Sequence, residues 1–428
     1  MTSGIGRLSR TLAACAALAV TIVAVQPGLS AQAGNGEHWI STWGTAVVPR
    51  SQGPQGPGRG GGPPAPRLEF NNQTVRQTVR VSLGGDRIRV VLSNVYGTET
   101  LVIGAAQVAL RDSGSRIAPN SNRPLLFDGK PTARIASGAV MISDPVALSV
   151  PSLADLAIDL YLPGDTASSM SPLTTDGARQ TNYVSTTGNH AGAATFPVAT
   201  DTEAWWFLSR VEVMAPAEAG TIVALGDSIT DGNGSTTDAY GRWPDLLAKR
   251  LADANNKMGV VNVGIPGNRV IGDRPNSASN RFDRDVLAQT GVAYVIFTEG
   301  INDLRNEGAP PVEELIMGHK QIIERAHAQG LTIFGGTILP LERDEEGGNG
   351  FSPTSEATRV ALNEWIRTSG AYDGVIDFEA VMKNPSRPSK LQEALQAGDW
   401  LHPNDAGYQK MVGVIDLSIF KPLTAGTN

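Results

Sequence analysis

From about residue 216 to the C-terminus, short strand-like apolar runs alternate with longer stretches that have helical patterns. Each run has the length of a buried strand, and each intervening stretch is long enough for a crossover helix. This alternation predicts βαβ units, and hence a parallel sheet with helices on both faces. The expected strands are 222–225, 260–263, 293–298, 332–337 and 375–378, and the expected helices are 242–254, 312–329, 356–369 and 406–419.

Residues 34–215 show a different pattern, with short β-rich runs separated by clusters of Gly, Pro, Asn and Asp at turn spacing. This spacing predicts an antiparallel sandwich or jelly roll. A chain of 428 residues is also too long for one ordinary core. We therefore predict two folded domains, 34–215 and 216–428. The expected β-rich runs of the first domain are 74–83, 87–93, 101–110, 139–142, 156–162 and 205–213.

Two features of the β-rich part bear on its role. The segment 50–66 is rich in Gly and Pro and has no side chains suited to a core, which predicts a mobile surface loop. Four tryptophans could form a platform for sugar rings, but tryptophans near the ends of a sandwich are more often core residues. The core interpretation is favoured for Trp39, Trp43, Trp205 and Trp206.

The N-terminus carries Arg7 and Arg10, then the apolar run 12–25, and then Ala31-Gln32-Ala33. This order is typical of a signal peptide, so we predict that residues 1–33 are removed near Ala33 and that the protein is exported. The destination would be the periplasm or the extracellular space. The apolar run is shorter than the roughly 20 residues of a spanning helix, and no second run of that length follows. No membrane anchor is therefore expected.

Cys15 is the only cysteine, and it lies within the predicted signal peptide. Because the apolar segment follows Cys15 instead of preceding it, we do not expect lipidation. The exported form would hold no thiol, which excludes a cysteine nucleophile, a thiolate metal site and a disulfide framework. The formal net charge is −7, so nucleic acid is not an expected partner. The sequence carries no signal for an oligomeric state.

A serine follows the first expected strand of the C-terminal part. The run 222–225 ends at Gly226, where the backbone can turn sharply, and Ser228 comes directly afterwards. Open α/β sheets bind ligands at the carboxyl ends of their strands, which favours a catalytic role for this hydroxyl. A helix cap formed by Asp227 and Ser228 explains these residues equally well.

Among the five histidines, one has a carboxylate at a suggestive spacing. Asp399 precedes His402 by three residues, so a turn of helical pitch would bring the carboxylate to the imidazole and fix its tautomer. The alternative is an aspartate and a histidine on a surface loop. His319 and His327 lie eight residues apart in one expected helix, where an exposed or half-buried position is favoured. The other two histidines lie in the β-rich part.

Two further segments lie at expected strand ends. The segment 261–268 contains glycines that would let backbone N–H groups approach a ligand closely. The segment 297–303 presents the side-chain amide of Asn302. Read singly, the first is a turn and the second a helix cap. Together they would surround Ser228 with hydrogen-bond donors.

These segments resemble the four signature blocks of the SGNH, or GDSL, hydrolase family. The resemblance covers about residues 220–420 and implies a flavodoxin-like sheet of about five parallel strands. In order and approximate spacing, the blocks are G-D-S at 226–228, N-x-G-x-x-G at 262–267, G-x-N-D at 300–303 and D-x-x-H at 399–402.

The resemblance also implies roles for individual residues. Ser228 would be the nucleophile, His402 its base and Asp399 the partner of the base. The oxyanion donors would be the N–H groups of Ser228 and Gly267 and the side-chain amide of Asn302.

Two further segments resemble one branch of the family, and one residue departs from the family pattern. The segments 242–251 and 281–287 look like those of arylesterases and carbohydrate acylesterases. Ile301 departs from the family pattern, since many relatives have Gly there, and a branched residue is expected to narrow the site.

The sequence thus predicts an ester hydrolase that works through an acyl-enzyme, without a cofactor. No metal is expected, because the His and Asp residues do not cluster into the three or four ligands that zinc needs. The expected substrate is a small-molecule or polysaccharide ester with a short acyl group, such as acetylated xylan. The alternatives are a general arylesterase or lipase-type acylhydrolase, and a non-catalytic carbohydrate-binding protein.

Overall fold

The computed structural model describes Met1 and residues 36–49, 69–166, 172–173, 179–272, 276–305, 309–343 and 352–423. The predicted signal peptide, apart from Met1, and the Gly/Pro-rich segment 50–66 lie outside these residues. Gly36–Asn428 forms one compact unit. Within the described part of the chain, no helix has the length and apolar character needed to cross a membrane.

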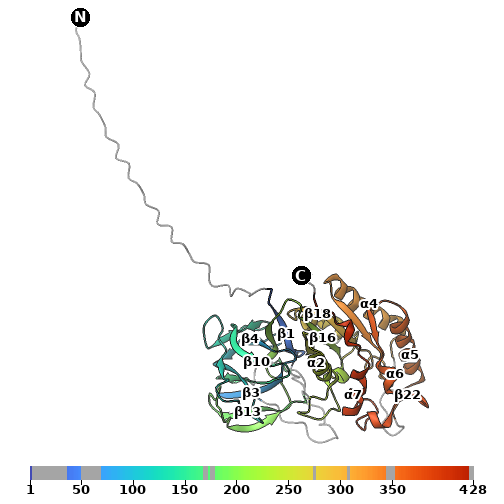
Figure 1. Cartoon of the computed structure of the whole chain (residues 1–428), viewed down its shortest axis with the longest axis horizontal. Coiled ribbons are helices and arrows are strands. Elements are labelled where there is room, and N and C mark those ends of the chain that lie inside the picture. Colours follow the sequence, from blue (N-terminus) through green and yellow to red (C-terminus); the bar gives the residue numbers. More distant parts are fainter. Residues whose placement is uncertain are drawn as a thin grey trace. The chain divides into compact units, whose positions relative to one another are not determined.

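The C-terminal part is built around a parallel sheet of five strands (Figure 1). All four neighbouring pairs run parallel, and each strand begins and ends within two residues of its predicted bounds. The predicted alternation of strands and helices is therefore confirmed. In spatial order the strands are β17 (Met258–Asn262), β16 (Gly220–Gly226), β18 (Val292–Thr298), β19 (Thr332–Gly336) and β20 (Gly374–Ile376).

The order of these strands creates a topological switch point. The chain passes from β16 outward to β17 and then returns to the other side of β16 with β18. Because crossover connections are right-handed, crossovers that move in opposite directions place their helices on opposite faces of the sheet. The carboxyl ends of β16 and β18 thus lie where α/β sheets of this kind bind ligands.

The helices of the C-terminal part pack in two groups. α2 contacts β17 and α7, whereas α4 contacts β19, α3 and α5. α4 buries Leu315, Ile322, Ile323 and Ala326, which share one face at helical spacing. The helices are α1 (Ser228–Asp231), α2 (Trp243–Asp253), α3 (Ala278–Phe282) with a π-helical turn (Asp283–Leu287), α4 (Val312–Ala328), α5 (Pro353–Thr368), α6 (Phe378–Met382) and α7 (Asp405–Gly413).

Three of the four predicted helices are confirmed, but the last was predicted too long. α7 ends at Gly413, and a separate 3₁₀ turn, Leu417–Ile419, follows. The Asp416 side chain accepts a hydrogen bond from the Ser418 N–H and so starts a new turn. The prediction also missed the hairpin of β21 (Lys383–Asn384) and β22 (Arg387–Leu391) and the 3₁₀ turn Glu393–Leu395 that precede α7.

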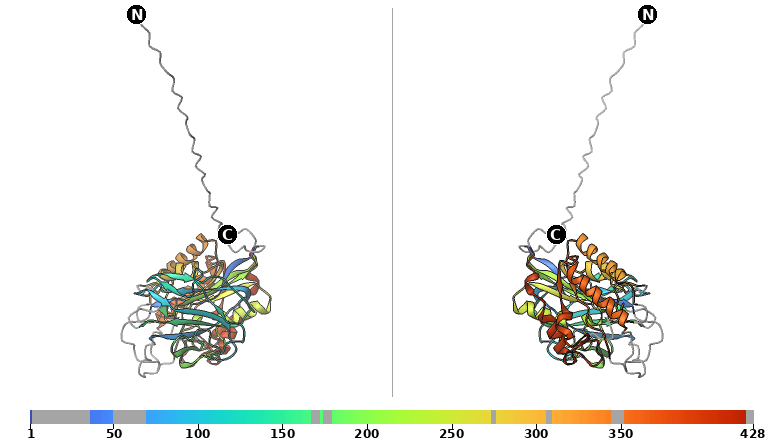
Figure 2. Two further views of the ribbon diagram at one scale, coloured as in Figure 1. Left: turned by 90° about the vertical axis from the view of Figure 1, so that its left-hand side faces the viewer. Right: turned by 90° about the vertical axis from the view of Figure 1, so that its right-hand side faces the viewer.

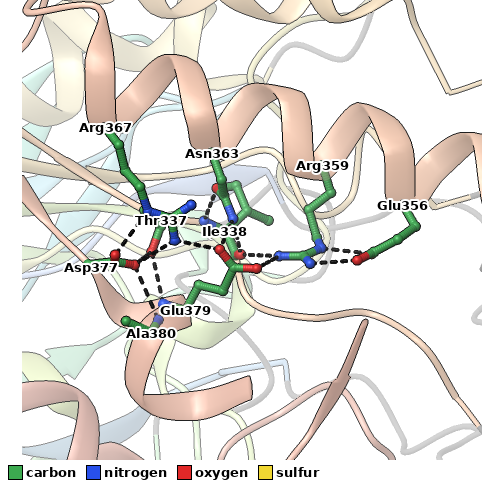
Figure 3. Close-up of polar contacts among 9 residues, drawn as sticks. All are labelled: Thr337, Ile338, Glu356, Arg359, Asn363, Arg367, Asp377, Glu379 and Ala380. Carbon is green, nitrogen blue, oxygen red and sulfur yellow. Dashed lines mark hydrogen bonds and ion pairs between the residues drawn. The ribbon is translucent and has the colours of Figure 1, made fainter. Parts of the chain in front are cut away.

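A buried ion-pair network holds α5 in place (Figure 3). Arg359 is fully buried and donates to Glu379 at 2.6 Å, while Arg367 donates to Glu379 at 2.5 Å and to Asp377 at 2.8 Å. The Asn363 side chain accepts the Ile338 N–H and donates to the Ile338 carbonyl oxygen, just beyond the end of β19. The network therefore fixes α5 to the carboxyl ends of β19 and β20.

The N-terminal part is rich in strands, as predicted, and they form two antiparallel sheets that share one hydrophobic cluster. The five-stranded sheet has β1 (His38–Gly44), β15 (Leu208–Ala215), β4 (Gly85–Ser93) and β10 (Val146–Val150) in this order, with β9 (Val140–Ile142) paired to β4. The six-stranded sheet has the order β14 (Val198–Thr202), β13 (Asn182–Thr187), β3 (Gln73–Arg80), β11 (Asp155–Leu162), β6 (Ala105–Leu110) and β7 (Arg123–Pro124). The remaining short strands are β2 (Val48–Pro49), β5 (Leu101–Ile103), β8 (Ala133–Ile135) and β12 (Pro172–Leu173).

Three predicted strands differ from the structure: the run 74–83 ends at Arg80 as β3, and two others differ for local reasons. The run 101–110 is split into β5 and β6 at Gly104, where a Cβ would approach the Tyr161 ring to 2.7 Å. The run 205–213 begins later, at Leu208, because Phe207 has a φ of +59°, outside the range of an extended strand. The strands β1, β2, β7, β8, β10, β12, β13 and β14 were not predicted.

Three of the four tryptophans belong to the core. Trp43, Trp205 and Trp206 are all at most 6% exposed, and the rings of Trp43 and Trp205 meet edge to face with centroids 5.0 Å apart. Trp39 is half-buried beneath the Arg89 guanidinium. The core interpretation therefore holds for these three residues.

The N-terminal strands cover the outer edge of the parallel sheet. β17 is an edge strand, and β1 packs along it. A Cβ on Gly259 would lie 2.3 Å from the Ser41 carbonyl oxygen, so this close approach requires glycine. Figure 1 shows the strand-rich part beside the helical C-terminal part, and the two views of Figure 2 show the strand-rich part in front in one and the helical part in front in the other. The packing of β1 covers the free edge of β17, which could otherwise pair with a strand of another chain.

Candidate active site

Ser228 lies at the switch point, directly after β16. Gly226 ends the strand where a Cβ would come within 2.5 Å of the Thr298 carbonyl oxygen. Asp227 is the N-cap of α1, and its carboxylate accepts the Ile229 N–H at 2.8 Å. The helix-cap interpretation is thus correct for Asp227. Ser228 is the first residue of α1 and is 4% exposed. Its hydroxyl is hydrogen-bonded to the His402 ring.

A chain of hydrogen bonds links Ser228, His402 and Asp399. Ser228 Oγ lies 2.8 Å from His402 Nε2, and His402 Nδ1 lies 2.5 Å from Asp399 Oδ2. Asp399 Oδ1 also accepts the backbone N–H groups of Leu401 and His402, at 3.0 and 2.9 Å. The structure therefore brings the three predicted residues together, although Ser228 and His402 lie 174 positions apart.

The surroundings of Asp399 favour its charged form. Partial burial opposes ionisation, but the hydrogen bond from the His402 ring, its charge and the two backbone N–H groups outweigh burial and lower the pKa of Asp399. A carboxylate held in this way keeps the proton of the imidazole on Nδ1. His402 Nε2 is then the nitrogen that accepts a proton from Ser228.

The predicted oxyanion donors lie on loops that converge on α1. Gly267 has a φ of +74°, the left-handed region that favours glycine. A Cβ on Gly264, in the same loop, would lie 2.3 Å from the Asp231 N, so this loop packs against α1. Asn302 follows β18 and donates from Nδ2 to the Asn268 carbonyl oxygen at 2.9 Å, next to Gly267. The structure thus joins these two donor segments.

The orientation of the Asn302 amide is fixed from both sides. Arg305 donates from Nη1 to Asn302 Oδ1 at 3.1 Å, while Asn302 Nδ2 bonds Asn268. An amide nitrogen has two protons, so one proton of Nδ2 is available for a ligand. Ile301 is 1% exposed and belongs to the hydrophobic core of this part, where a branched side chain fills space that glycine would leave.

Arg281 was not identified as a site residue from the sequence. Its side chain is fully buried and donates to the carbonyl oxygens of Gly226 at 2.9 Å and Val263 at 2.5 Å, and to Asn268 Oδ1 at 3.0 Å. It therefore ties the end of β16 to the loop that carries Gly267. Its sequence signals were its place at the start of the segment 281–287, which looks like that of arylesterases, and its spacing of four residues from Asp285, which also predicts an ordinary exposed helix pair.

Several acids lie buried near Ser228. Burial raises the pKa of Asp303 to about 6, although its carboxylate accepts the Val270 N–H at 2.9 Å. Burial also raises the pKa values of Asp227 and Glu299, and Arg281 Nη2 lies 4.0 Å from Glu299 Oε2. Across the described ranges, no three His, Cys, Asp or Glu side chains are grouped so that they could hold a metal ion.

The prediction for His319 was wrong. His319 is fully buried, with Nδ1 2.5 Å from the Tyr372 hydroxyl and its ring 4.9 Å from that of Phe297. Burial lowers the pKa of His319 to about 3. Its face of α4 packs toward β18, and Tyr372 supplies the polar partner that makes burial possible. His327 is more than a third exposed and pairs with Asp373 at 3.0 Å.

The fold and this geometry together define a class of protein. It is an α/β protein in which a serine, a histidine and an aspartate form one hydrogen-bonded chain at the switch point of a parallel sheet. Residues 224–410 match the model of the GDSL-like lipase/acylhydrolase family. This part of the chain is a GDSL-like lipase/acylhydrolase domain, and the chain is a carboxylic ester hydrolase.

Several solved structures are similar to this chain over less than half of its length. The lipase/acylhydrolase from Enterococcus faecalis is 21% identical, with a TM-score of 0.38, and the match covers 48% of this chain and 100% of that one. A carbohydrate acetylesterase family member from Sinorhizobium meliloti is 15% identical, with a TM-score of 0.38 and coverage of 47% and 97%. The psychrotrophic esterase EstA from Pseudoalteromonas sp. is 18% identical, with a TM-score of 0.35 and coverage of 46% and 93%. Curated proteins give no significant match.

Proposed function

We propose that this protein is an exported serine esterase that hydrolyses short-chain acyl esters, above all acetyl esters, through Ser228, His402 and Asp399. The observation that carries the proposal is the chain of hydrogen bonds from Ser228 Oγ through the His402 ring to Asp399, at 2.8 and 2.5 Å. This geometry supplies a nucleophile, its base and the group that orients the base.

In the first half of the reaction, His402 Nε2 takes the proton of Ser228 while Oγ attacks the ester carbonyl carbon. The negative charge that develops on the carbonyl oxygen is met by the N–H groups of Ser228 and Gly267 and by the free proton of the Asn302 amide. The protonated His402 then gives its proton to the departing alcohol. An acyl group remains on Ser228.

In the second half, His402 Nε2 takes a proton from a water molecule, which attacks the acyl carbon. The tetrahedral intermediate collapses, the carboxylic acid leaves, and Ser228 Oγ regains its proton from His402. Asp399 remains a carboxylate throughout and stabilises the imidazolium that forms in each half.

We propose a small-molecule or polysaccharide ester, such as acetylated xylan, as the substrate. The predicted export and the strand-rich part ahead of the hydrolase support a substrate outside the cell. We also propose removal of residues 1–33 near Ala33 and a division into domains 34–215 and 216–428. The first would be a β-sandwich of the jelly-roll kind, supported by its two antiparallel sheets around one core. The second would be flavodoxin-like, supported by its strand order.

The decisive experiment measures ester hydrolysis over acyl lengths from acetyl to palmitoyl, together with acetyl release from xylan. We expect activity to be highest with acetyl and to fall with chain length, and Ser228→Ala to abolish it. A maximum at long acyl chains would favour a lipase-type acylhydrolase. Ser228 should also react with a fluorophosphonate, and an unreactive Ser228 would favour a non-catalytic binding protein.

A further inference from the structure

The loop between α1 and α2, residues Gly232–Arg242, packs against the segment that carries His402. We call it the 232–242 loop. Gly234 has a φ of +91°, and a Cβ there would lie 2.4 Å from the Pro403 carbonyl oxygen and 3.4 Å from His402 Cβ. Only glycine allows this approach. The position of the loop therefore limits the position of His402.

The first turns of α7 bind the same loop through side chains. Asp405, three residues after His402, accepts the Thr236 N–H at 2.9 Å and the Thr236 hydroxyl at 2.6 Å. The hydroxyl of the fully buried Tyr408 donates to the Asn233 carbonyl oxygen at 2.7 Å. On this side, hydrogen bonds join the 232–242 loop to α7, which directly follows the segment that carries His402.

The opposite side of the loop is held by the N-terminal strands. Asp238 Oδ1 accepts Gln180 Nε2 at 2.5 Å and the Thr181 N–H at 2.7 Å, and Oδ2 accepts the Thr181 hydroxyl at 2.6 Å. The Asp238 N–H donates to the Arg179 carbonyl oxygen at 3.0 Å. Residues 179–181 lead directly into β13 of the six-stranded sheet.

Two further contacts extend this attachment. The Thr237 hydroxyl donates to Glu203 at 3.0 Å, and the Arg80 guanidinium lies 3.4 Å from the centre of the Tyr240 ring. Asp238 and Tyr240 have φ values of +64° and +53°, which residues with side chains rarely adopt. Such backbone conformations persist where surrounding contacts impose them. The N-terminal strands therefore help to impose the shape of the loop.

We propose that the N-terminal strands take part in catalysis by holding the 232–242 loop through Asp238, and thereby position His402 against Ser228. Asp238 is a positioning residue in this scheme, since it acts through the loop and Asp405. The proposal rests on the proposed function of Ser228 and His402. It differs from a carbohydrate-binding role for the strands, which would change the binding of polymers and leave the reaction of a small ester unaffected.

The test compares Asp238→Ala and Asp238→Asn with the unaltered protein, using 4-nitrophenyl acetate. We expect Asp238→Ala to lower kcat about tenfold with KM changed less than about twofold, because displaced catalytic groups lose rate steeply. The rate at which Ser228 reacts with a fluorophosphonate should fall in parallel. Asp238→Asn should restore most of kcat, since its carbonyl oxygen can still accept from Gln180 and Thr181.

The matched control is Asp253→Ala, which removes an exposed carboxylate of α2 that pairs with Lys249. It should leave kcat unchanged. A folded Asp238→Ala variant with normal kcat on the small ester would overturn the proposal, whether or not its KM for xylan rises.

If Asp238→Ala does not fold, Thr181→Val decides the question. This change removes the hydroxyl that donates to Asp238 and keeps the backbone N–H. We expect kcat to fall about threefold, and an unchanged kcat would overturn the proposal. If the unaltered protein shows neither ester hydrolysis nor labelling of Ser228, the proposed function itself fails, and this inference fails with it.

Discussion

The orientation of Asn302 is determined by hydrogen bonds on both sides of its amide. Its amide is held by Asn268 on one side and Arg305 on the other, so one proton is presented to a ligand with little freedom. A donor fixed in advance needs no reorganisation when charge develops on the substrate oxygen.

We therefore expect Asn302→Ala to lower kcat about 10²–10³-fold while KM changes little, because the lost hydrogen bond forms mainly in the transition state. Steady-state kinetics with 4-nitrophenyl acetate measure both constants. Asn71→Ala, at an exposed position, serves as the matched control. A raised KM with an unchanged kcat would contradict the oxyanion role.

His319 makes a second prediction at this scale. Burial lowers its pKa from 6.5 to about 3. Between these values the unfolded chain binds a proton that the folded chain does not bind, so stability falls as the pH falls. Relative to His319→Gln, the unaltered protein should lose on the order of 3 kcal/mol of unfolding free energy between pH 7 and pH 4. Urea unfolding at both pH values measures this difference, and parallel pH profiles would contradict it.

Among the elements, α5 depends on charges that lie in the interior. Glu379 on α6 receives hydrogen bonds from Arg359 and Arg367, and their charges help to lower the pKa of Glu379 against the opposing effect of burial. Without Glu379, Arg359 would keep only Glu356 and Arg367 only Asp377 as carboxylate partners. The network in Figure 3 is therefore a point where one substitution affects two helices.

We expect Glu379→Ala to reduce the unfolding free energy by about 1–3 kcal/mol, because the buried Arg359 loses one of its two carboxylate partners and keeps only Glu356. Thermal unfolding at pH 7 measures the loss. Glu364→Ala, at an exposed position on α5, is the matched control and should change stability little. Equal stability of the two variants would show that the network adds nothing to the fold.

At the scale of the whole molecule, the strand-rich and parallel-sheet parts are joined by buried hydrogen bonds. Ser82 Oγ accepts the Val260 N–H of β17 at 2.7 Å and donates to the Thr42 carbonyl oxygen at 2.5 Å. The Thr221 hydroxyl donates to the Ser41 carbonyl oxygen at 3.0 Å. Contacts of this kind make the folding of one part depend on the other.

We therefore expect the protein to unfold in one calorimetric transition. Ser82→Ala should shift that whole transition to lower temperature, because it leaves a buried N–H without a partner at a cost of about 1–3 kcal/mol. Ser113→Ala, at an exposed position in the strand-rich part, is the control. Two separate transitions, of which only one moves, would contradict this coupling.

The sequence by itself determined the parallel sheet and the positions of its strands, and its resemblance to the SGNH hydrolases implied the residues of the proposed triad and oxyanion hole. Apolar runs of strand length between helical stretches permit few arrangements, and the carboxyl ends of parallel strands meet at one edge. The contact between Asp399 and His402 could also be predicted from the sequence, because a single turn of the chain brings the two side chains together. The strand ends indicated where a site would lie, and the four family-like blocks implied which residues around Ser228 would form it.

Only the tertiary structure decided which polar residues are buried and what holds them. Arg281 and His319 look like surface residues of helices, because periodicity does not reveal which face meets the sheet when the buried side chain is polar. Their partners Gly226 and Tyr372 lie 55 and 53 positions away in the sequence. The hydrogen bonds from Gln180 and Thr181 to Asp238 likewise join segments more than fifty positions apart. Such bonds leave no local pattern in the sequence.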